Sequence, residues 1–228
     1  LSGANTFSGA TVVEAGRLSL SGSGGLASSV IDVRAGSELD VSGVSAAFTL
    51  ANGQRLKLGG AVVGDLVAGT GSVLEPAKGL AEVSMGGLTM NGTLQVALGT
   101  PGTVLVPGVS DKVAIAGNLV LGGASKLTLV DNAGAGSKGS FGAGRYLVGS
   151  YSGTRTGSFF TVENPSATTL HEKVVLDDAS GSLFVDAYRL ASAGVATSVT
   201  LAAVREGGTF EVAKLAVSNT ANADGFSE

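Results

Sequence analysis

The chain contains no cysteine and no tryptophan, and aromatic residues make up only 5% of its 228 residues. Without cysteine, disulfides and thiolate metal sites are excluded. Because large rings are scarce, a core has to be filled by valine, leucine, isoleucine and alanine. Side chains of this size suit a narrow core, such as the interior of a thin stack of short strands.

Charge of either sign is also scarce, at 14% of residues with a net charge of −4. Lysine and arginine are scattered singly, so nucleic acid and anionic membrane surfaces are not expected partners. No run approaches the roughly 18 consecutive apolar residues of a membrane-spanning helix, so we expect no membrane insertion by this segment. The start, Leu1-Ser2-Gly3, lacks the features of a signal peptide, and we expect the chain to begin inside a larger protein or after processing.

Glycine is abundant, at 37 residues, and hydrophobic residues make up 44% of the chain. This mixture is too apolar for a disordered linker and too aperiodic in glycine for collagen. Apolar residues alternate with polar ones in bursts of about five, separated by Gly, Asn, Asp or Ser. Helical periodicity is nearly absent, so the pattern predicts an all-β protein with many short strands and tight turns.

Many bursts share one signature, in which Gly precedes one or two polar residues and then Leu-x-Leu or Leu-x-Val. The spacing from Leu18 to Leu39 is 21 residues, and steps of 17, 17 and 21 then reach Leu56, Val73 and Leu94. A repeat of about 20 residues is the length that one coil of a solenoid needs. The glycine permits a sharp corner, and the Leu-x-Leu points two side chains inward and one outward.

We therefore predict an all-β fold, a parallel β-helix or β-solenoid over residues 1–190, with irregular capping coils from about residue 130. A polar, glycine-rich loop is expected at 131–139. Residues 191–228 read differently, as antiparallel strands that open an incomplete immunoglobulin-like sandwich or form a strand-exchange segment. Exposed strand edges there would allow self-association with a neighbouring chain, but the boundary of the sequence explains the incomplete module equally well.

The first 18 residues carry a specific motif, Leu1-Ser2-Gly3 followed by Asn5-Thr6-Phe7-Ser8-Gly9, Thr11-Val12-Val13 and Ala15-Gly16-Arg17-Leu18. This order resembles the autotransporter-associated β-strand repeat. The later stretches 144–148 and 157–160 are similar to the segment that ends many such passengers. The resemblance implies a right-handed parallel β-helix in adhesins and matrix proteins of the bacterial surface, and it implies no catalytic residues. Residues 199–228 resemble the beginning of Ig-like modules of anchored bacterial surface proteins.

Few residues suggest chemistry. His171 is the only histidine, and together with Asp177 and Asp178 it offers the residue types of a metal or acid–base site. A polar connection between strands explains this cluster better. Polysaccharide lyases and hydrolases with β-helix folds use paired carboxylates from successive coils. The outward carboxylates show no repeated alignment; they are Asp32, Glu38, Asp40 and Asp65.

Glycine-rich stretches are interpreted as turns. Residues 22–25 lack the aspartate of calcium-binding nonapeptide repeats. Residues 69–72 and 134–136 are too generic for phosphate binding, and no helix follows them. We therefore assign no catalytic, cofactor-binding or metal-binding residue and expect no cofactor.

The sequence leads to two hypotheses on function. The first is a non-enzymatic structural or adhesive scaffold, secreted to the bacterial cell surface or extracellular matrix, that binds surface glycans or host and matrix components. A variant of it assembles into fibres by β-strand complementation. The alternative is a carbohydrate-active β-helix enzyme, a polysaccharide lyase or hydrolase.

Overall fold

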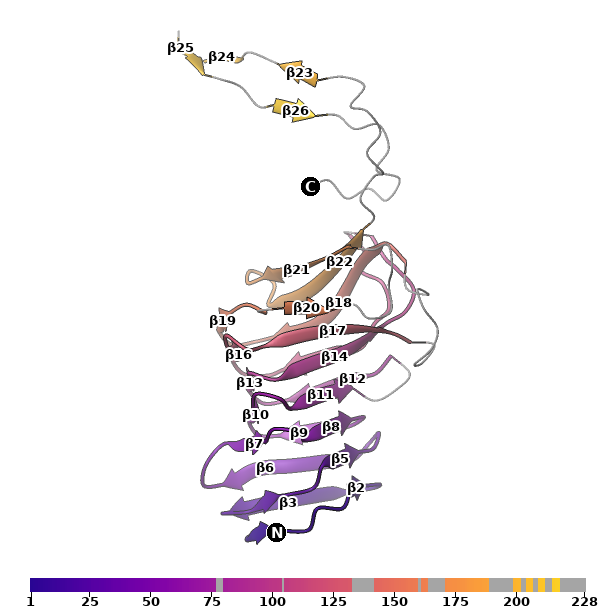
Figure 1. The fold of residues 1–228 in the computed structure, drawn as a ribbon, viewed down its shortest axis with the longest axis vertical. Coiled ribbons are helices and arrows are strands. Elements are labelled where there is room, and N and C mark those ends of the chain that lie inside the picture. Colours follow the sequence, from indigo (N-terminus) through magenta and orange to yellow (C-terminus); the bar gives the residue numbers. More distant parts are fainter. Residues whose placement is uncertain are drawn as a thin grey trace.

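The computed structural model describes residues 1–76, 80–103, 105–132, 142–159, 161–163 and 171–188, together with four three-residue strands between residues 199 and 217. All regular structure in these residues is β-strand, and none of them lies in a helix. Figure 1 shows the strands stacked in layers from the N-terminus upward. The predicted all-β class is therefore confirmed.

Three sheets make up the main body. The first sheet contains β2 (Thr11–Val13), β5 (Val30–Val33), β8 (Arg55–Leu58), β11 (Val73–Pro76), β14 (Thr93–Leu98), β17 (Lys126–Asp131) and β20 (Thr161–Glu163). The second contains β3 (Arg17–Gly22), β6 (Glu38–Val44), β9 (Ala61–Val63), β12 (Glu82–Met85), β15 (Lys112–Ile115), β18 (Gly144–Tyr151), β22 (Ser182–Tyr188) and β21 (His171–Asp177). The third contains β7 (Phe48–Leu50), β10 (Leu66–Ala68), β13 (Leu88–Met90), β16 (Leu119–Leu121) and β19 (Arg155–Gly157), and β1 (Ala4–Asn5) pairs with β4 (Gly25–Leu26) separately.

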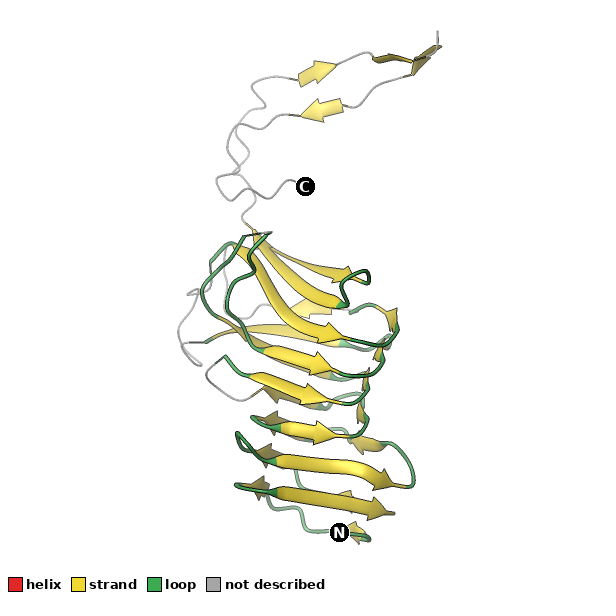
Figure 2. Ribbon diagram, turned by 180° about the vertical axis from the view of Figure 1, so that it is seen from behind, coloured by secondary structure: helices red, strands yellow, loops and turns green. Residues whose placement is uncertain are grey.

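The order of strands follows one rule through the body. In the first and third sheets every strand pairs in parallel with the strand three positions later, and the second sheet follows the same rule from β3 to β18. The chain thus passes through the three sheets in turn, and we call one such passage a circuit. Figure 2 shows the successive circuits from behind, with short loops joining the sheets. Parallel pairing between circuits satisfies the backbone groups of each strand.

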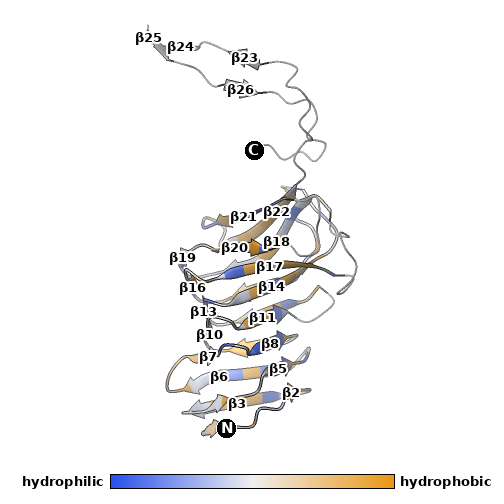
Figure 3. Ribbon diagram, viewed as in Figure 1, coloured by the Kyte–Doolittle hydropathy of each residue, from blue (hydrophilic) through white to orange (hydrophobic). Residues whose placement is uncertain are grey.

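Side chains alternate across the strands as predicted. In β8 the side chains of Leu56 and Leu58 are fully buried, whereas the alternate residues Arg55 and Lys57 are only partly buried. Figure 3 shows the same alternation as blue and orange residues along the strands. In the first sheet the inward residues form one continuous column across the circuits: Ile31, Leu56, Leu74, Leu94 and Leu127.

The repeat spacing predicted from the leucines is only partly right. Leu18 and Leu39 are partners in the second sheet, as expected. Leu56 instead lies in the first sheet, where it pairs with Ile31 and Leu74, and Val73 faces outward beside Arg55. The prediction failed because the connections differ in length, so that equal steps along the sequence reach different sheets.

The corners depend on glycine and on buried polar side chains. Gly53 and Gly71, which precede β8 and β11, have φ angles of 79° and 78°, the left-handed region that favours glycine. Ser72 is buried and donates from its hydroxyl to the carbonyl of Gly69 at 2.7 Å. These contacts satisfy corner groups that would otherwise be buried without partners.

The second sheet ends in two antiparallel strands, because β22 pairs with both β18 and β21. Arg145 holds Asp186 with two hydrogen bonds of 2.6 Å and lies over the ring of Phe184, 5.1 Å from its centre. Arg155 likewise binds both carboxylate oxygens of Asp178 at 2.6 Å. These bidentate pairs fix β18 to β22 and β19 to the turn between β21 and β22.

Residues 199–217 include two antiparallel pairs, β23 (Val199–Leu201) with β26 (Leu215–Val217) and β24 (Val204–Glu206) with β25 (Thr209–Glu211). The Ig-like or strand-exchange interpretation of residues 191–228 remains a prediction. Most of the loop predicted at 131–139 lies outside the described residues.

Candidate functional site

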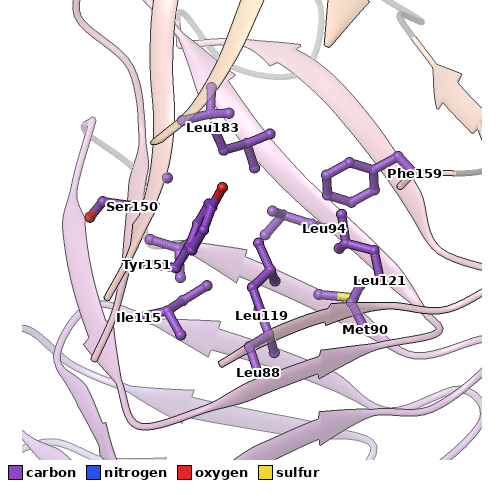
Figure 4. Close-up of a pocket in the computed structure, with 13 residues that line it drawn as sticks. Leu88, Met90, Leu94, Ile115, Leu119, Leu121, Ser150, Tyr151, Phe159 and Leu183 are labelled. Atoms are coloured by element: carbon purple, nitrogen blue, oxygen red, sulfur yellow. The ribbon is translucent and has the colours of Figure 1, made fainter. Parts of the chain in front are cut away.

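The interior around Tyr151, in the described part of the stack, is packed as a core. Figure 4 shows side chains from three sheets meeting there, among them Leu88, Met90, Leu119 and Tyr151. The remaining cavity measures about 10 Å³, which is the limit for one water molecule, and its lining is apolar. This part of the described core therefore has no room for a ligand.

The cluster sketched from the sequence around the single histidine does not form a site. His171 begins β21 and Asp177 ends it, so about 20 Å of extended strand separates them. Asp177 accepts hydrogen bonds from the hydroxyl and amide of Ser180, which lower its pKa. The Arg155 guanidinium, with the Tyr151 hydroxyl, lowers the pKa of Asp178 to about 2. No group of three potential metal ligands occurs among the described residues.

The four outward carboxylates noted in the sequence each have a structural partner. Asp32 lies 3.3 Å from Arg34, and Glu38 lies 2.6 Å from Arg17. Asp40 accepts the hydroxyl of Ser42, which is the main reason that its pKa is lowered.

Asp65 accepts the amide of Gly87 at 2.6 Å, which ties one circuit to the next. All four groups therefore support turns or neighbouring strands.

One alignment of charge was missed in the sequence. The outer side of the first sheet carries three charged residues in register, Asp32, Lys57 and Glu75. Arg55 forms an ion pair with Glu75. The two carboxylates are two strand spacings apart, roughly 10 Å, with the lysine between them. The charges of this row and of Arg55 compensate one another across the strands. The row can be recognised only when the strand register is known.

The outer row of the third sheet has no charge. Its strands are three residues long, so each presents one outward side chain, and these are Thr49, Val67, Thr89, Val120 and Thr156. The result is a straight row of methyl and hydroxyl groups at intervals of about 4.8 Å. The outer rows of the first and third sheets therefore differ in character.

A loop projects between β14 and β15, at residues 99–111, of which Val104 lies outside the described residues. Its two arms are joined by hydrogen bonds from Gly99 to Val109 and from Val109 to Thr100, both of 2.9 Å. Gly108 donates to the carbonyl of Arg145 at 2.7 Å, which fixes the loop to β18. The loop is therefore held at both its base and its side.

Asp111 anchors the end of this loop. It is 2% exposed, and its two carboxylate oxygens accept the amides of Ala97 and Ala81 at 2.7 and 2.9 Å. Burial raises its pKa to about 6, and the charge of Glu75 adds to the increase, while the two amides act in the opposite direction. The carboxylate therefore titrates just below neutral pH.

The tip of the loop is apolar and exposed. Leu105 is 92% exposed and Val106 is 70% exposed, the highest values among the exposed large hydrophobic residues described. The amide of Val106 donates a hydrogen bond of 3.0 Å to the hydroxyl oxygen of Thr103.

A groove of about 580 Å³ opens where the third sheet is interrupted, because β4 and β7 belong to separate sheets. The buried side chains of Leu26 and Phe48 contribute to its lining. Gln54 bridges the interruption by donating to the carbonyls of Leu26 and Ser28 at 2.9 and 2.8 Å. None of the residues that line this groove carries a charge.

Comparisons with protein-family models, with curated proteins and with solved structures find no match for this chain. Within the described part, the structure has no helix of the length and apolarity needed to cross a membrane.

Proposed function

We propose that residues 1–190 form a parallel β-helix that serves as a structural and adhesive scaffold, secreted to the bacterial cell surface or its matrix. The observation that carries the proposal is the register of the three sheets, in which strands three positions apart pair in parallel over successive circuits. A stack of this kind forms a long and stiff body from a short repeated unit, because each circuit buries its face on the next.

The likeness of residues 1–18 to the autotransporter-associated repeat supports both the surface location and a right-handed coil, the hand that parallel crossover connections almost always take. The carboxylates that a β-helix enzyme would use have structural partners where they are described, as with Asp32 and Glu38. The scaffold needs no catalytic group. Its adhesive partners are surface glycans or matrix components.

We assign adhesion to the uncharged outer row of the third sheet. Its hydroxyl and methyl groups match the mixed polar and apolar faces of a neutral polysaccharide, and no charge has to be desolvated. Thr89 lies at the centre of this row and is half-buried, so a charged side chain there would interrupt the flat surface.

The test uses the full chain incubated with a panel of insoluble polysaccharides and matrix polymers, with retention and release of soluble sugars measured in the same samples. We expect retention on at least one polymer without sugar release, and a loss of at least about tenfold in affinity for Thr89→Lys. Lys57→Ala on the first sheet is the matched control and retains binding. Sugar release that disappears in Asp32→Asn or Glu75→Gln would show catalysis and overturn the proposal.

A further inference from the structure

Two corners of the stack have the same dipeptide, asparagine followed by glycine. Asn52-Gly53 precedes β8, and Asn91-Gly92 precedes β14. In this dipeptide the side-chain amide is followed by a backbone nitrogen whose residue has no side chain to hinder ring closure. The two corners therefore have the same intrinsic reactivity, and any difference between them comes from the fold.

The reaction open to this dipeptide is deamidation. The backbone nitrogen of Gly53 bonds to Cγ of Asn52, the bond from Cγ to the side-chain nitrogen breaks, and that nitrogen leaves as ammonia with the proton of the Gly53 amide. Water then opens the cyclic imide at one of its two carbonyls and gives aspartate or isoaspartate. One water is consumed and one ammonia is released, so no oxidant, reductant or cofactor is needed.

The corner at Asn52 has room for this reaction. Asn52 and Gly53 are both exposed, and a Cβ added to Gly53 would meet nothing within 4 Å beyond its chain neighbours. The amide of Gly53 donates one hydrogen bond of 3.1 Å, to the carbonyl of Gly71, and this bond has to open first. Opening an exposed corner of this kind costs little free energy. The nitrogen of Gly53 can therefore reach Cγ of Asn52 while the circuit stays folded.

The corner at Asn91 is closed. Gly92 is buried, and a Cβ added there would lie 2.6 Å from the carbonyl oxygen of Ser72 and 2.7 Å from that of Gly69. The amides of Asn91 and Gly92 both donate to the carbonyl of Ala68, at 2.8 and 3.0 Å. Ring closure has to move this backbone out of contact with the preceding circuit, so it requires a larger and more costly opening.

We propose that Asn52 is a site of spontaneous deamidation and isoaspartate formation in the folded protein, and that the fold protects Asn91 from the same reaction. This inference stands apart from the scaffold proposal, because it depends only on the two corners. It makes the corner before β8 the place where the described part of the stack changes chemically with age.

The product alters the contacts of the same corner. Isoaspartate adds one methylene to the main chain immediately before Gly53, inside a turn that Gln54 closes by donating its amide to the carbonyl of Ala51 at 3.0 Å. The side chain of Gln54 holds the carbonyls of Leu26 and Ser28 across the interrupted third sheet. A longer main chain shifts Gln54 away from these carbonyls, so we expect the aged protein to be less stable.

The test is peptide mapping by mass spectrometry of the full chain, kept folded in mildly alkaline buffer and sampled over several weeks. Enzymatic methylation that is specific for isoaspartate identifies the rearranged product. We expect Asn52 to convert at least about tenfold faster than Asn91. The same chain unfolded in guanidinium chloride is the control, and there the two asparagines should convert at similar rates.

Two variants test the consequence for stability. Asn52→Gln keeps a side-chain amide but needs a larger ring, which closes far more slowly, so this variant should keep its urea midpoint on ageing while that of the unchanged chain falls. Asn91→Gln is the matched control and should age as the unchanged chain does. Circular dichroism before ageing verifies that each variant is folded.

Two results would overturn the assignment of the site: Asn52 staying intact in the folded chain while it converts in denaturant, or Asn91 converting as fast as Asn52 in the folded chain. Both are measured on the unchanged chain, so they decide the matter even when a variant fails to fold. An aged chain that contains isoaspartate at position 52 and keeps its urea midpoint would overturn the predicted loss of stability.

Discussion

The sharpest test of the register concerns two adjacent apolar residues of β11. Leu74 is fully buried and lies in the inward column between Leu56 and Leu94, whereas Val73 points outward beside Arg55. Leu74→Ala removes buried carbons and leaves a cavity that the paired strands above and below prevent from collapsing. We expect a loss of about 2 to 5 kcal/mol in the free energy of unfolding. Val73→Ala removes partly exposed carbons and should cost about 1 kcal/mol or less.

Urea titrations followed by far-ultraviolet circular dichroism measure both changes. The midpoints are compared at equal slope, because a changed slope would mean that the unfolding transition itself had altered. The two variants share one strand and one kind of chemical change, so each controls for the other. If Val73→Ala costs as much as Leu74→Ala, the register of β11 is wrong by one residue, since a slip of one exchanges the two faces.

Three further outcomes are expected. Burial raises the pKa of Asp111 to about 6, so the stabilisation from its protonated form is complete below about pH 3.8 and is lost as the pH rises through 6. Urea titrations at pH 5 and pH 7.5 should show the part of this loss that falls between those pH values, about 1.4 kcal/mol, and Asp111→Asn should abolish it; an unchanged pH dependence in the variant would refute the assignment. Gly60→Ala would place a Cβ 1.9 Å from a backbone carbonyl oxygen of the preceding circuit and should cost more than about 2 kcal/mol, whereas Gly123→Ala, with open space around it, should cost less than about 1. A double-mutant cycle of Arg145→Ala and Asp186→Ala should give a coupling of about 1 to 3 kcal/mol, and a coupling near zero would mean that the pair is not formed in solution.

The sequence was sufficient to predict the inward side chains of strands such as β8, although Val73, which it grouped with the inward leucines, faces outward. Alternation is a local property of a strand, so Leu56 and Leu58 could be recognised as buried and Lys57 as outward from three residues alone. The same holds for some corner glycines such as Gly53, which has a positive φ, but not for Gly92 and Gly117, which also precede strands. Local patterns therefore predicted the strands and their faces.

The assignment of strands to sheets could not be predicted in this way. Leu56 lies 18 residues before its partner Leu74, but Leu94 lies 33 residues before its partner Leu127, because the projecting loop lies between them. Lengthening a surface loop changes the free energy of unfolding only a little, so the sequence pattern does not fix the length of a connection. A repeat counted from the sequence therefore drifts from one sheet to another.

The polar contacts of the corners and loops could not be predicted from the sequence either. Asp111 stands in a plain Ser-Asp-Lys stretch, and its burial depends on amides 14 and 30 residues away, at Ala97 and Ala81. Likewise nothing near Gln54 in the sequence marks it as the bridge across an interrupted sheet. Such roles require the positions of distant backbone groups, which only the folded arrangement provides.

The projecting loop shows the same limit. Prolines and glycines at 101–102 and 107–108 indicate turns, but the exposure of Leu105 follows from how the two arms meet and from their attachment to β18. A hydrophobic residue in a loop is unremarkable in a sequence, because many lie on surfaces singly. Its fixed and exposed position is seen only in the folded arrangement.

The central claim is that successive circuits stack in parallel, and pulsed electron spin resonance tests it most directly. Thr49 and Thr156 occupy the same outer row, four strand spacings apart, which corresponds to about 19 Å. Since the chain has no cysteine, Thr49→Cys and Thr156→Cys can be spin-labelled without other changes. A narrow distribution centred near 20 Å is the predicted result, and a broad distribution or one centred beyond about 35 Å would contradict the stack.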